Sequence, residues 1–288
     1  MNIDGETIVI GLIGWPVGHS YSPAMHNAAA AALGLNLVYV PMPVAPERLA
    51  DALRGLPALG IRGVNVTVPY KEAVLPHLDA VYPAAQIIGA VNTIVVGDGR
   101  LTGFNTDWSG FLADLESYRL ALYGRDCLIL GAGGSARAVA YALLRRGCRV
   151  TIAARRPEQA EKVATEMSRA FPEAATVAAV ALDEVVTTAA HLDAPILINT
   201  TPLGMADSRS GEWAAHSPWP DGAPFPAGSF VYDLVYNPSP TRLMTQARDA
   251  GLRAADGLGM LVRQAAEAFE VMTGRRPEVE VMRERAGF

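Results

Sequence analysis

The 288-residue chain has little cysteine, no excess of basic charge and no long apolar run, and each shortage excludes a class of protein. Its two cysteines, Cys127 and Cys148, both stand in apolar strand-like runs, so we interpret them as buried thiols of a reducing compartment rather than as a disulfide or a metal pair. The net charge of −5 excludes the basic surface that nucleic-acid binding needs. No run approaches the ~18 apolar residues of a membrane span, and Met1–Asp4 carries no basic leader. We therefore expect a cytoplasmic protein without nucleic-acid or membrane partners.

The composition describes a compact globular protein with a large core, since 50% of its residues are hydrophobic and 18% are charged. Single cores stop growing near ~250 residues, so the chain can hold one large or two ordinary domains. Its five histidines show no metal-ligand spacing, and we expect no metal.

Strand-like and helix-like segments alternate along the chain, which predicts an α/β fold with mostly parallel sheets. The predicted strands are residues 8–13, 37–40, 63–68, 92–96, 100–103, 127–130, 150–153, 195–199 and 229–234. The predicted helices are residues 22–33, 46–54, 139–146 and about 258–272. The dipeptide Asp98-Gly99 marks a hairpin turn between two of the strands.

The most informative stretch is Gly63–Glu72, where polar side chains gather at the end of an apolar strand. Alternation places the valines at 64, 66 and 68 on one face and Asn65 and Thr67 on the other. Pro69 ends the strand, and Lys71 follows within the next turn. Polar groups at a strand end often serve a ligand; the alternative is an edge strand with a wet face that runs into a helix carrying a solvated Lys71.

A glycine-rich turn, Gly131-Ala132-Gly133-Gly134-Ser135, follows the buried strand 127–130 and precedes the helix 139–146. This order is typical of a dinucleotide-binding βαβ unit. Small residues let the backbone approach a pyrophosphate, which then binds the N–H groups at the helix N-terminus. The alternative is a tight turn without a ligand.

The end of the next strand indicates which dinucleotide this unit prefers. NAD-binding units usually place an acid there for the ribose 2′-hydroxyl. This chain has Ala154-Arg155-Arg156 instead. Because a guanidinium group offers a planar fork of donors to a phosphate, we predict NADP, with some NAD use possible. Alternatively, the two arginines are the solvated start of a helix near Pro157.

Taken together, the ordered motifs resemble those of the shikimate dehydrogenase family, which includes quinate/shikimate dehydrogenases. The resemblance covers nearly the whole chain, and its motifs are Gly18-His19-Ser20-Tyr21-Ser22-Pro23, Asn65–Glu72, Ala90-Val91-Asn92-Thr93, Asn105-Thr106-Asp107, Gly131–Ser135, Asn199–Met205, Tyr232–Pro238 and Asp256–Leu261.

The resemblance implies an enzyme of aromatic amino-acid biosynthesis that interconverts shikimate and 3-dehydroshikimate with NADP. It implies that Lys71 and Asp107 are the catalytic pair. It also implies substrate-binding residues, namely Ser20, Ser22, Asn65, Thr67, Asn92, Tyr236 and Gln264. The implied cofactor-binding residues are Gly131, Ala132, Gly133, Gly134, Ser135, Arg155, Arg156, Thr200, Leu234, Gly257 and Met260.

The family fold implies a two-domain α/β protein with a cleft between an N-terminal substrate domain and a Rossmann-type dinucleotide-binding domain. On this sequence, residues 1–107 with the C-terminal helices 257–288 form the catalytic domain, and residues 108–256 form the NADP-binding domain. We expect a monomer or a homodimer.

Two departures from the family pattern keep other interpretations open. Trp108 stands where glycine is common, and Ala154-Arg155-Arg156 stands where Asn-Arg-Thr is usual. The alternatives are a quinate-using or aminoshikimate-using paralogue with NAD use, and a non-catalytic ligand-binding or regulatory protein on the same scaffold. Ser22 and Asp107 could also serve as helix caps, and Tyr236 could be a packing residue.

Overall fold

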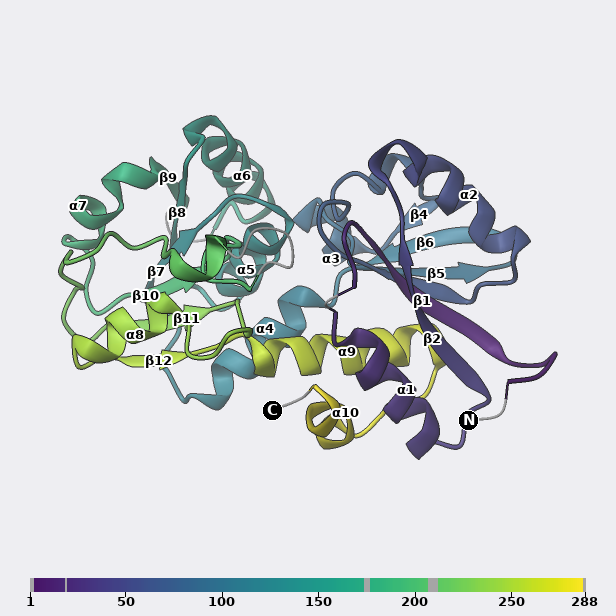
Figure 1. The fold of residues 1–288 in the computed structure, drawn as a ribbon. Coiled ribbons are helices and arrows are strands. Elements are labelled where there is room, and N and C mark those ends of the chain that lie inside the picture. Colours follow the sequence, from purple (N-terminus) through teal and green to yellow (C-terminus); the bar gives the residue numbers. More distant parts are fainter. Residues whose placement is uncertain (1–2, 19, 174–176, 207–211, 287–288) are drawn as a thin grey trace. The chain divides into compact units, whose positions relative to one another are not determined.

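The computed structural model describes residues 3–18, 20–173, 177–206 and 212–286, and the chain divides into two compact units (Figure 1). The first unit comprises Met1–Gly110 and Leu261–Phe288, and the second comprises Phe111–Met260. Both boundaries fall inside helices, α4 (Asp107–Ser117) and α9 (Leu258–Thr273).

The first unit is built on a six-stranded sheet with the strand order β2-β1-β3-β5-β6-β4. Its strands are β1 (Ile8–Gly14), β2 (Leu37–Pro43), β3 (Gly63–Val66), β4 (Ala80–Val81), β5 (Thr93–Gly97) and β6 (Arg100–Phe104). Besides parts of α4 and α9, its helices are α1 (Ser22–Ala32), α2 (Leu49–Ala58), α3 (Pro83–Ile88) and α10 (Val279–Arg285), with 3-10 turns at Pro46–Arg48 and Leu75–His77.

This first sheet is mixed, so the expectation of mostly parallel sheets holds only for part of it. β1 pairs in parallel with β2 and β3, whereas β5 pairs antiparallel with both β3 and β6. The hairpin between β5 and β6 turns at Asp98 and Gly99, whose φ angles are 49° and 73°. Two consecutive positive φ angles are what a tight hairpin turn requires, and they confirm the turn predicted from Asp-Gly.

The strand predicted over residues 63–68 is shorter in the structure, because β3 ends at Val66. Val64 and Val66 are buried, but Val68 lies beyond the strand and is 66% exposed, so the prediction that three valines share one face of this strand is wrong at its last member. Asn65 is buried as well. β3 is therefore covered on both faces, and residues 67–74 form turns instead of continuing the strand.

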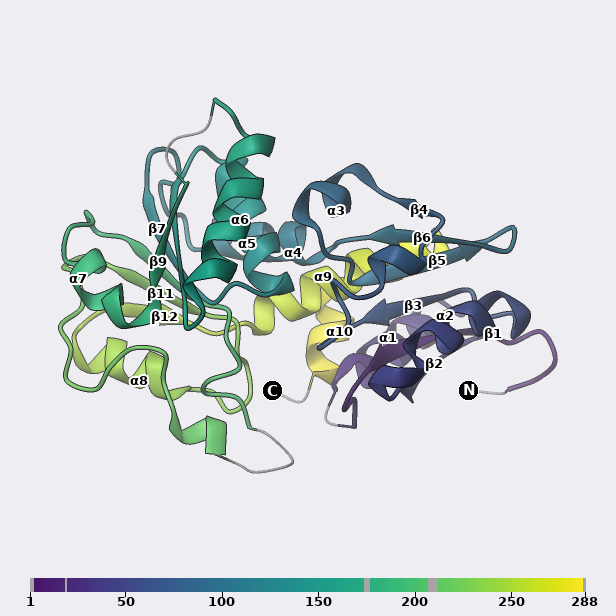
Figure 2. The ribbon, with the colours of Figure 1, turned by 90° about the horizontal axis from the view of Figure 1, so that it is seen from above.

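Helices cover the first sheet closely (Figure 2). α1 packs against β2 and α3 against β6. Gly63 lets α9 approach β3, since a Cβ atom on this residue would lie 2.9 Å from Met272 Cγ. The apolar core beneath includes Ile13, Leu53 and Ile94.

The second unit contains a six-stranded sheet in which every pair is parallel, in the order β12-β11-β10-β7-β8-β9. Its strands are β7 (Asp126–Leu130), β8 (Arg149–Ala154), β9 (Val177–Ala181), β10 (Ile196–Asn199), β11 (Phe230–Asp233) and β12 (Arg253–Ala255). Its helices include α5 (Gly134–Leu144), α6 (Pro157–Ala170), α7 (Val185–Ala189) and α8 (Arg242–Asp249), with 3-10 turns at Leu182–Glu184 and Glu212–Ala215. This order is the doubly wound arrangement of dinucleotide-binding domains, so the predicted two-domain α/β fold with a Rossmann-type unit is confirmed.

The sequence of the second unit explains its layers. All five residues of β7 are buried, which is typical of a central parallel strand covered by helices on both faces. α6 buries Ala160, Val163, Ala164 and Met167, a spacing that gives one apolar stripe, and it packs against β8 and β9. Cys127 and Cys148 are buried free thiols, as predicted.

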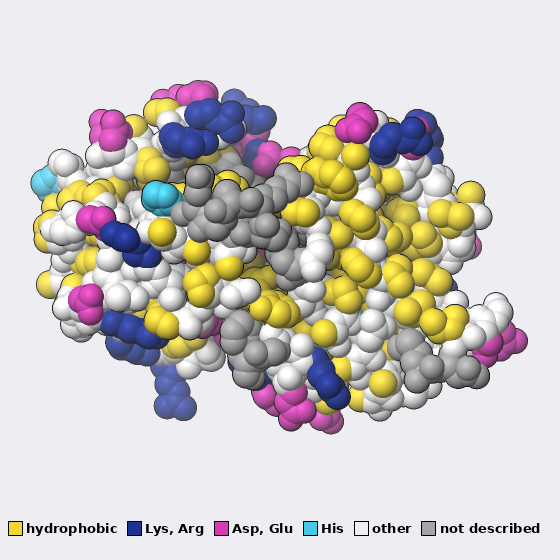
Figure 3. All heavy atoms as spheres, in the orientation of Figure 1, with side chains coloured by type: hydrophobic (Ala, Val, Ile, Leu, Met, Phe, Trp, Pro, Cys, Tyr) yellow, Lys and Arg dark blue, Asp and Glu magenta, His cyan; other side chains and the backbone are white. Residues whose placement is uncertain are grey.

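The surface carries charge of both signs, and on the face shown in Figure 3 the Lys and Arg side chains form separate groups among acidic ones. This mixture agrees with the small net charge of −5. Within the described ranges, no helix has the length and apolar character needed to cross a membrane.

Candidate active site

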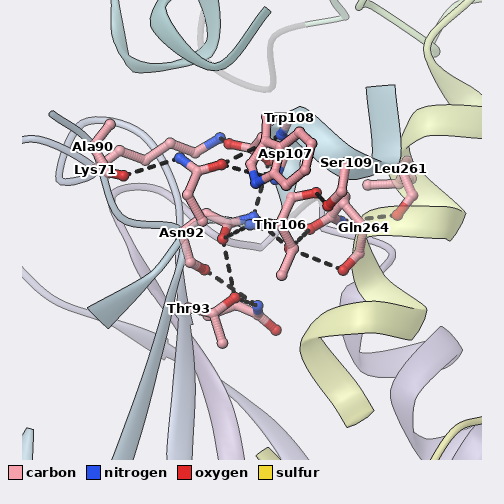
Figure 4. Close-up of polar contacts among 12 residues, drawn as sticks. Lys71, Ala90, Asn92, Thr93, Thr106, Asp107, Trp108, Ser109, Leu261 and Gln264 are labelled. Atoms are coloured by element: carbon pink, nitrogen blue, oxygen red, sulfur yellow. Dashed lines mark hydrogen bonds and ion pairs between the residues drawn. The ribbon is translucent and has the colours of Figure 1, made fainter. Parts of the chain in front are cut away.

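An ion pair of low exposure joins the two residues that the resemblance implies to be catalytic. Lys71 Nζ lies 2.7 Å from Asp107 Oδ2, and the two side chains are 15% and 5% exposed. Because little water reaches either group, salt screens their attraction less than that of a surface pair. Figure 4 shows the Lys71 side chain extending to the start of α4, where Asp107 stands. The structure brings the two residues together, and their catalytic role stays a prediction.

The backbone around Lys71 is fixed by its neighbours. The carbonyl of Lys71 accepts a hydrogen bond from Val91 N at 2.7 Å. The preceding residue, Tyr70, is buried, and its hydroxyl donates to Val44 O at 2.5 Å. Lys71 thus lies in an anchored turn after β3 and not on the solvated helix of the alternative interpretation.

Asp107 is the first residue of α4, but another residue caps this helix. Asn105 Oδ1 accepts from the backbone N–H groups of Asp107 at 3.0 Å and of Trp108 at 3.4 Å, while Asn105 Nδ2 donates to Ala90 O at 2.9 Å. The interpretation of Asp107 as a helix cap is therefore wrong. Its carboxylate is left for other groups, and a negative charge in the first turn also interacts favourably with the helix dipole.

Asn92 holds the second oxygen of Asp107. Asn92 Oδ1 accepts from Thr106 N at 2.8 Å, and because a backbone N–H can only donate, this bond fixes which end of the amide is which. Asn92 Nδ2 then lies 3.0 Å from Asp107 Oδ1 and 2.9 Å from Thr106 Oγ1. Asp107 is thus held from both sides, by Lys71 on Oδ2 and by Asn92 on Oδ1.

Gln264 joins the same network from α9. Its Oε1 lies 3.3 Å from Asn92 Nδ2, its Nε2 donates to Leu261 O at 2.8 Å, and its carbonyl accepts from Thr106 Oγ1 at 3.0 Å. Gly110 allows α4 to come this close, because a Cβ atom there would lie 2.7 Å from Gln264 N. The predicted residue Gln264 therefore lies beside the ion-paired carboxylate.

Asn65 is linked to Asn92 from the neighbouring strand. Its Nδ2 donates to Asn92 O at 3.2 Å and to Thr93 Oγ1 at 3.1 Å, and its Oδ1 accepts from Tyr39 OH at 2.9 Å. Both amide hydrogens are thus used inside the protein. What remains for a ligand is the second lone pair of Oδ1, which suits a hydroxyl group and not a carboxylate.

Tyr39 is a residue that sequence reasoning missed. It is buried in β2, its hydroxyl serves Asn65, and Ser22 also hydrogen-bonds it. Its ring stacks on that of His26, with centroids 4.2 Å apart and an interplanar angle of 15°. A signal was present, since a tyrosine at an inward-facing strand position needs a polar partner for its hydroxyl.

The other predicted substrate residues are placed as follows. Ser20 Oγ accepts from Ser22 N at 3.2 Å, and α1 begins at Ser22 itself after Tyr21, so the interpretation of Ser22 as the cap of this helix is wrong. Thr67 is half-buried just beyond β3. Tyr236 belongs to the second unit, after β11. His19 of the first motif lies outside the described residues.

The glycine-rich turn of the second unit has the geometry of an anion site. Gly131 has a φ of 118°, which side chains rarely adopt, and a Cβ atom there would overlap Thr200 Oγ1. α5 starts at Gly134 without a side-chain cap, and none of the described residues has an atom within 4 Å of a Cβ atom built on Gly133. The first N–H groups of α5 are therefore available to a ligand, and the predicted pyrophosphate fits this turn.

The other predicted cofactor residues gather at the same edge of the parallel sheet. Thr200 and Leu234 directly follow β10 and β11, and Gly257 packs against the carbonyl of Leu234, where a side chain would overlap it. Met260 is buried near the start of α9. Ala132 and Ser135 belong to the glycine-rich turn itself, and Arg155 and Arg156 are exposed after β8. Ligands of such sheets bind outside the carboxyl ends of the strands.

A doubly wound nucleotide unit and a separate unit with a held Lys–Asp pair are typical of the dinucleotide-linked oxidoreductases. Family models give a narrower placement. The model of the shikimate dehydrogenase substrate binding domain matches residues 12–94, that of shikimate / quinate 5-dehydrogenase matches residues 114–209, and that of the shikimate 5'-dehydrogenase C-terminal domain matches residues 257–286.

Individual relatives agree with these matches. The chain is 47% identical to the NADP(+) shikimate dehydrogenase of Symbiobacterium thermophilum over 97% of this chain and 93% of that protein. It is 48% identical to that of Moorella thermoacetica over 98% and 93%. The crystal structure of shikimate 5-dehydrogenase from Thermus thermophilus in complex with NADP(H) and shikimate matches with a TM-score of 0.83 and 40% identity, over 97% of this chain and 98% of that one. The chain belongs to the shikimate dehydrogenase family.

The stacked pair behind Asn65 predicts a loss of stability in acid. His26 is 1% exposed, and burial lowers its pKa to about 3, from 6.5 in an unfolded chain. Between these values the unfolded chain binds a proton that the folded protein does not, so the free energy of unfolding falls as the pH falls below 6.5. From pH 7 to pH 5, we expect His26 to lower the free energy of unfolding by about 2 kcal/mol.

Urea unfolding of the wild type and of His26→Phe at pH 7 and pH 5 measures this cost. The variant keeps a ring against Tyr39 but cannot bind a proton. Its free energy of unfolding should therefore fall by about 2 kcal/mol less than that of the wild type between pH 7 and pH 5. His77→Gln is the matched control, because His77 is exposed, and it should behave as the wild type does. An equal acid loss in the wild type and in His26→Phe would contradict the prediction.

Proposed function

We propose that this protein catalyses the reversible oxidation of the 3-hydroxyl group of shikimate to give 3-dehydroshikimate, with NADP as the hydride carrier. The observation that carries the proposal is the Lys71–Asp107 pair, held by Asn92 in a chain of this family. The reaction belongs to the formation of aromatic amino acids. The roles of the individual residues, the assignment of the domains and the compartment belong to the same proposal.

The chemistry requires two transfers from one alcohol group. The hydride leaves the carbon that bears the hydroxyl, and NADP+ supplies the acceptor for it when bound. The hydroxyl proton must go to a base within hydrogen-bond reach. Lys71 Nζ donates a hydrogen bond to Asp107 Oδ2 across 2.7 Å, and we propose that this pair takes the proton and later releases it to water. In the reverse direction the same pair returns a proton to the carbonyl oxygen as the hydride arrives.

The fixed geometry of the pair is an advantage for this step. Asp107 cannot turn away, because Asn92 occupies its other oxygen and Asn105 holds the backbone beneath it. A base that is already oriented loses little freedom when the substrate binds, which lowers the barrier. We propose that Asn92, Asn65 and Gln264 bind hydroxyl groups of the substrate, and that Ser20, Ser22 and Thr67 bind its carboxylate. We propose Tyr236 as a further substrate residue.

The second unit supplies the groups that would hold NADP. The uncapped start of α5 suits the pyrophosphate, and the exposed Arg155 and Arg156 suit the 2′-phosphate. We therefore assign residues 108–256 to NADP binding, and residues 1–107 with 257–288 to substrate binding and catalysis. We propose the cytoplasm as the compartment, because a reducing environment keeps thiols such as Cys127 and Cys148 free.

The direct test is nicotinamide reduction at 340 nm with purified protein, crossing shikimate and quinate with NADP and NAD. The proposal predicts the highest kcat/KM for shikimate with NADP. A preference for quinate or for NAD would contradict the substrate or the cofactor part, and the residues to vary would then be Trp108 or Ala154. Silence in all four combinations would contradict the proposal as a whole.

Removing the lysine tests the proposed proton transfer. Lys71→Ala should lower kcat by 10²- to 10⁴-fold, roughly the range of general acid–base catalysis, and should leave the dissociation constant of NADP unchanged. Lys162→Ala is the matched control, since Lys162 is the only other lysine of the chain and is exposed on α6. Steady-state kinetics and NADP titration measure both effects. Normal turnover of Lys71→Ala would remove Lys71 from the mechanism.

Removing one arginine tests the proposed 2′-phosphate contact. Arg155→Ala should raise the KM for NADP by about tenfold to a hundredfold, the worth of one charge-assisted hydrogen bond, and leave the KM for NAD nearly unchanged. Arg169→Ala, an exposed arginine on the same helix as the control lysine, should change neither constant. An equal rise for both dinucleotides would show that Arg155 does not discriminate between them.

A further inference from the structure

The last residue of β11, Asp233, is a carboxylate with no exposed surface. It accepts three hydrogen bonds, from Asn199 Nδ2 at 2.8 Å, from Val235 N at 3.0 Å and from Thr241 Oγ1 at 2.6 Å. All three donors are neutral groups. Burial raises the pKa of Asp233 to about 6 even though these hydrogen bonds act in the opposite direction. Keeping such a charge away from water costs stability, so packing alone does not explain this carboxylate.

Asn199, the last residue of β10, extends the network into the next loop. Its Oδ1 accepts from Thr201 N at 2.9 Å and from Thr201 Oγ1 at 2.7 Å, and its Nδ2 donates to Leu203 O at 3.0 Å as well as to Asp233. The amide is therefore used at both ends. It ties residues 201–203 to the end of β11.

The same loop presses on the glycine-rich turn. Thr200 Oγ1 donates to Leu130 O at 2.8 Å, and it fills the space that a side chain on Gly131 would need. Thr200 thus touches the residue from which the chain turns toward α5. Asp233 and Gly131 are separated by a single strand, because β10 pairs directly with both β11 and β7.

Thr241 closes the network on the other side. Its hydroxyl donates to Asp233 Oδ2 and accepts from Met244 N at 3.2 Å, so it also caps α8. The segment 234–241 is therefore bound to Asp233 twice, near its beginning through Val235 N and at its end through Thr241 Oγ1. Leu234, one of the predicted cofactor residues, follows Asp233 directly.

We propose that Asp233 is a positioning residue of the dinucleotide site, whose carboxylate fixes the loops after β10 and β11 so that Thr200 supports the glycine-rich turn and Leu234 faces the ligand edge. The inference rests on the proposed binding of NADP. It adds a residue that touches no ligand and acts through Asn199 and Thr200. A side chain with polar atoms at two positions suits this point, because Asn199 and Val235 donate to one oxygen of Asp233 and Thr241 donates to the other.

The conservative replacement Asp233→Asn tests whether the hydrogen bonds of this residue or its negative charge matter for NADP binding. In Asp233→Asn, the remaining oxygen can accept from Asn199 and Val235, and the new amide N–H can donate to the hydroxyl of Thr241. The dissociation constant of NADP should then stay within about threefold of the wild type. Asp233→Ala leaves buried donors without an acceptor. The cost corresponds to a factor of about ten or more in an equilibrium constant, so the dissociation constant of NADP should rise at least tenfold.

The experiment compares three variants with the wild type by NADP titration, steady-state kinetics and thermal unfolding. Asp126→Ala is the matched control, because Asp126 is a buried carboxylate of the same sheet at the opposite end of β7, where it pairs with Arg149. It should lower Tm without changing the KM for NADP. Asp233→Ala should raise the KM for NADP at least tenfold and that for shikimate less than twofold. Equal NADP binding by Asp233→Ala and the wild type would overturn the inference, whatever happens to Tm.

A further variant, Thr201→Val, tests the inference if Asp233→Ala does not fold. Thr201→Val removes a half-buried hydroxyl that donates to Asn199 Oδ1 and accepts from Leu203 N, so it should raise the KM for NADP by at least about threefold, the worth of one weak hydrogen bond. An unchanged KM would also overturn the inference. If the wild type itself fails to bind NADP, the proposed function is contradicted and not only the role of Asp233.

Discussion

The candidate active site depends on one constraint, the burial of the Asp107 carboxylate between two donors. A buried charge is costly unless it is paired and hydrogen-bonded, and here Lys71 and Asn92 take one oxygen each. The surrounding polar groups follow from this need. Asn92 must be oriented, and Thr106 N orients it; α4 must start at Asp107, and Asn105 supplies its cap. Removing any one of these groups would release the carboxylate or leave a buried polar group without a partner.

In both units, one polar residue beside the end of a strand holds the neighbouring loops through hydrogen bonds. In the first unit this residue is Asn92, next to the start of β5, which joins Asp107, Thr106 and Asn65. In the second unit it is Asp233, which joins Asn199 and Thr241. Both lie where strands give way to loops, and there a rigid sheet can fix the direction of functional side chains.

Much of this could be predicted from the sequence, for identifiable reasons. The Rossmann-type unit was predictable because a buried strand, a glycine-rich turn and an apolar helix follow one another in a short stretch, and the local sequence encodes each of them. The pairing of Lys71 with Asp107 was predictable only through the family resemblance, since 36 residues separate them along the chain. Periodicity failed at Val68, because the strand ends at Val66 and the following turns expose it. The sequence indicates that Tyr39 needs a polar partner but not that this partner is Asn65, and the role of Asn105 was not predictable, because hydrogen bonds between distant segments leave no local pattern.

The central claim is that Lys71 and Asp107 act as one unit, and a double-mutant cycle on kcat/KM tests it most directly. The variants are Lys71→Met, Asp107→Asn and the two combined, assayed with shikimate and NADP. Residues that act as a unit are strongly non-additive, so the account predicts that the double variant is hardly slower than the slower single variant. Losses that multiply across the two substitutions would contradict it, because they would mean that each residue acts on the substrate independently of the other.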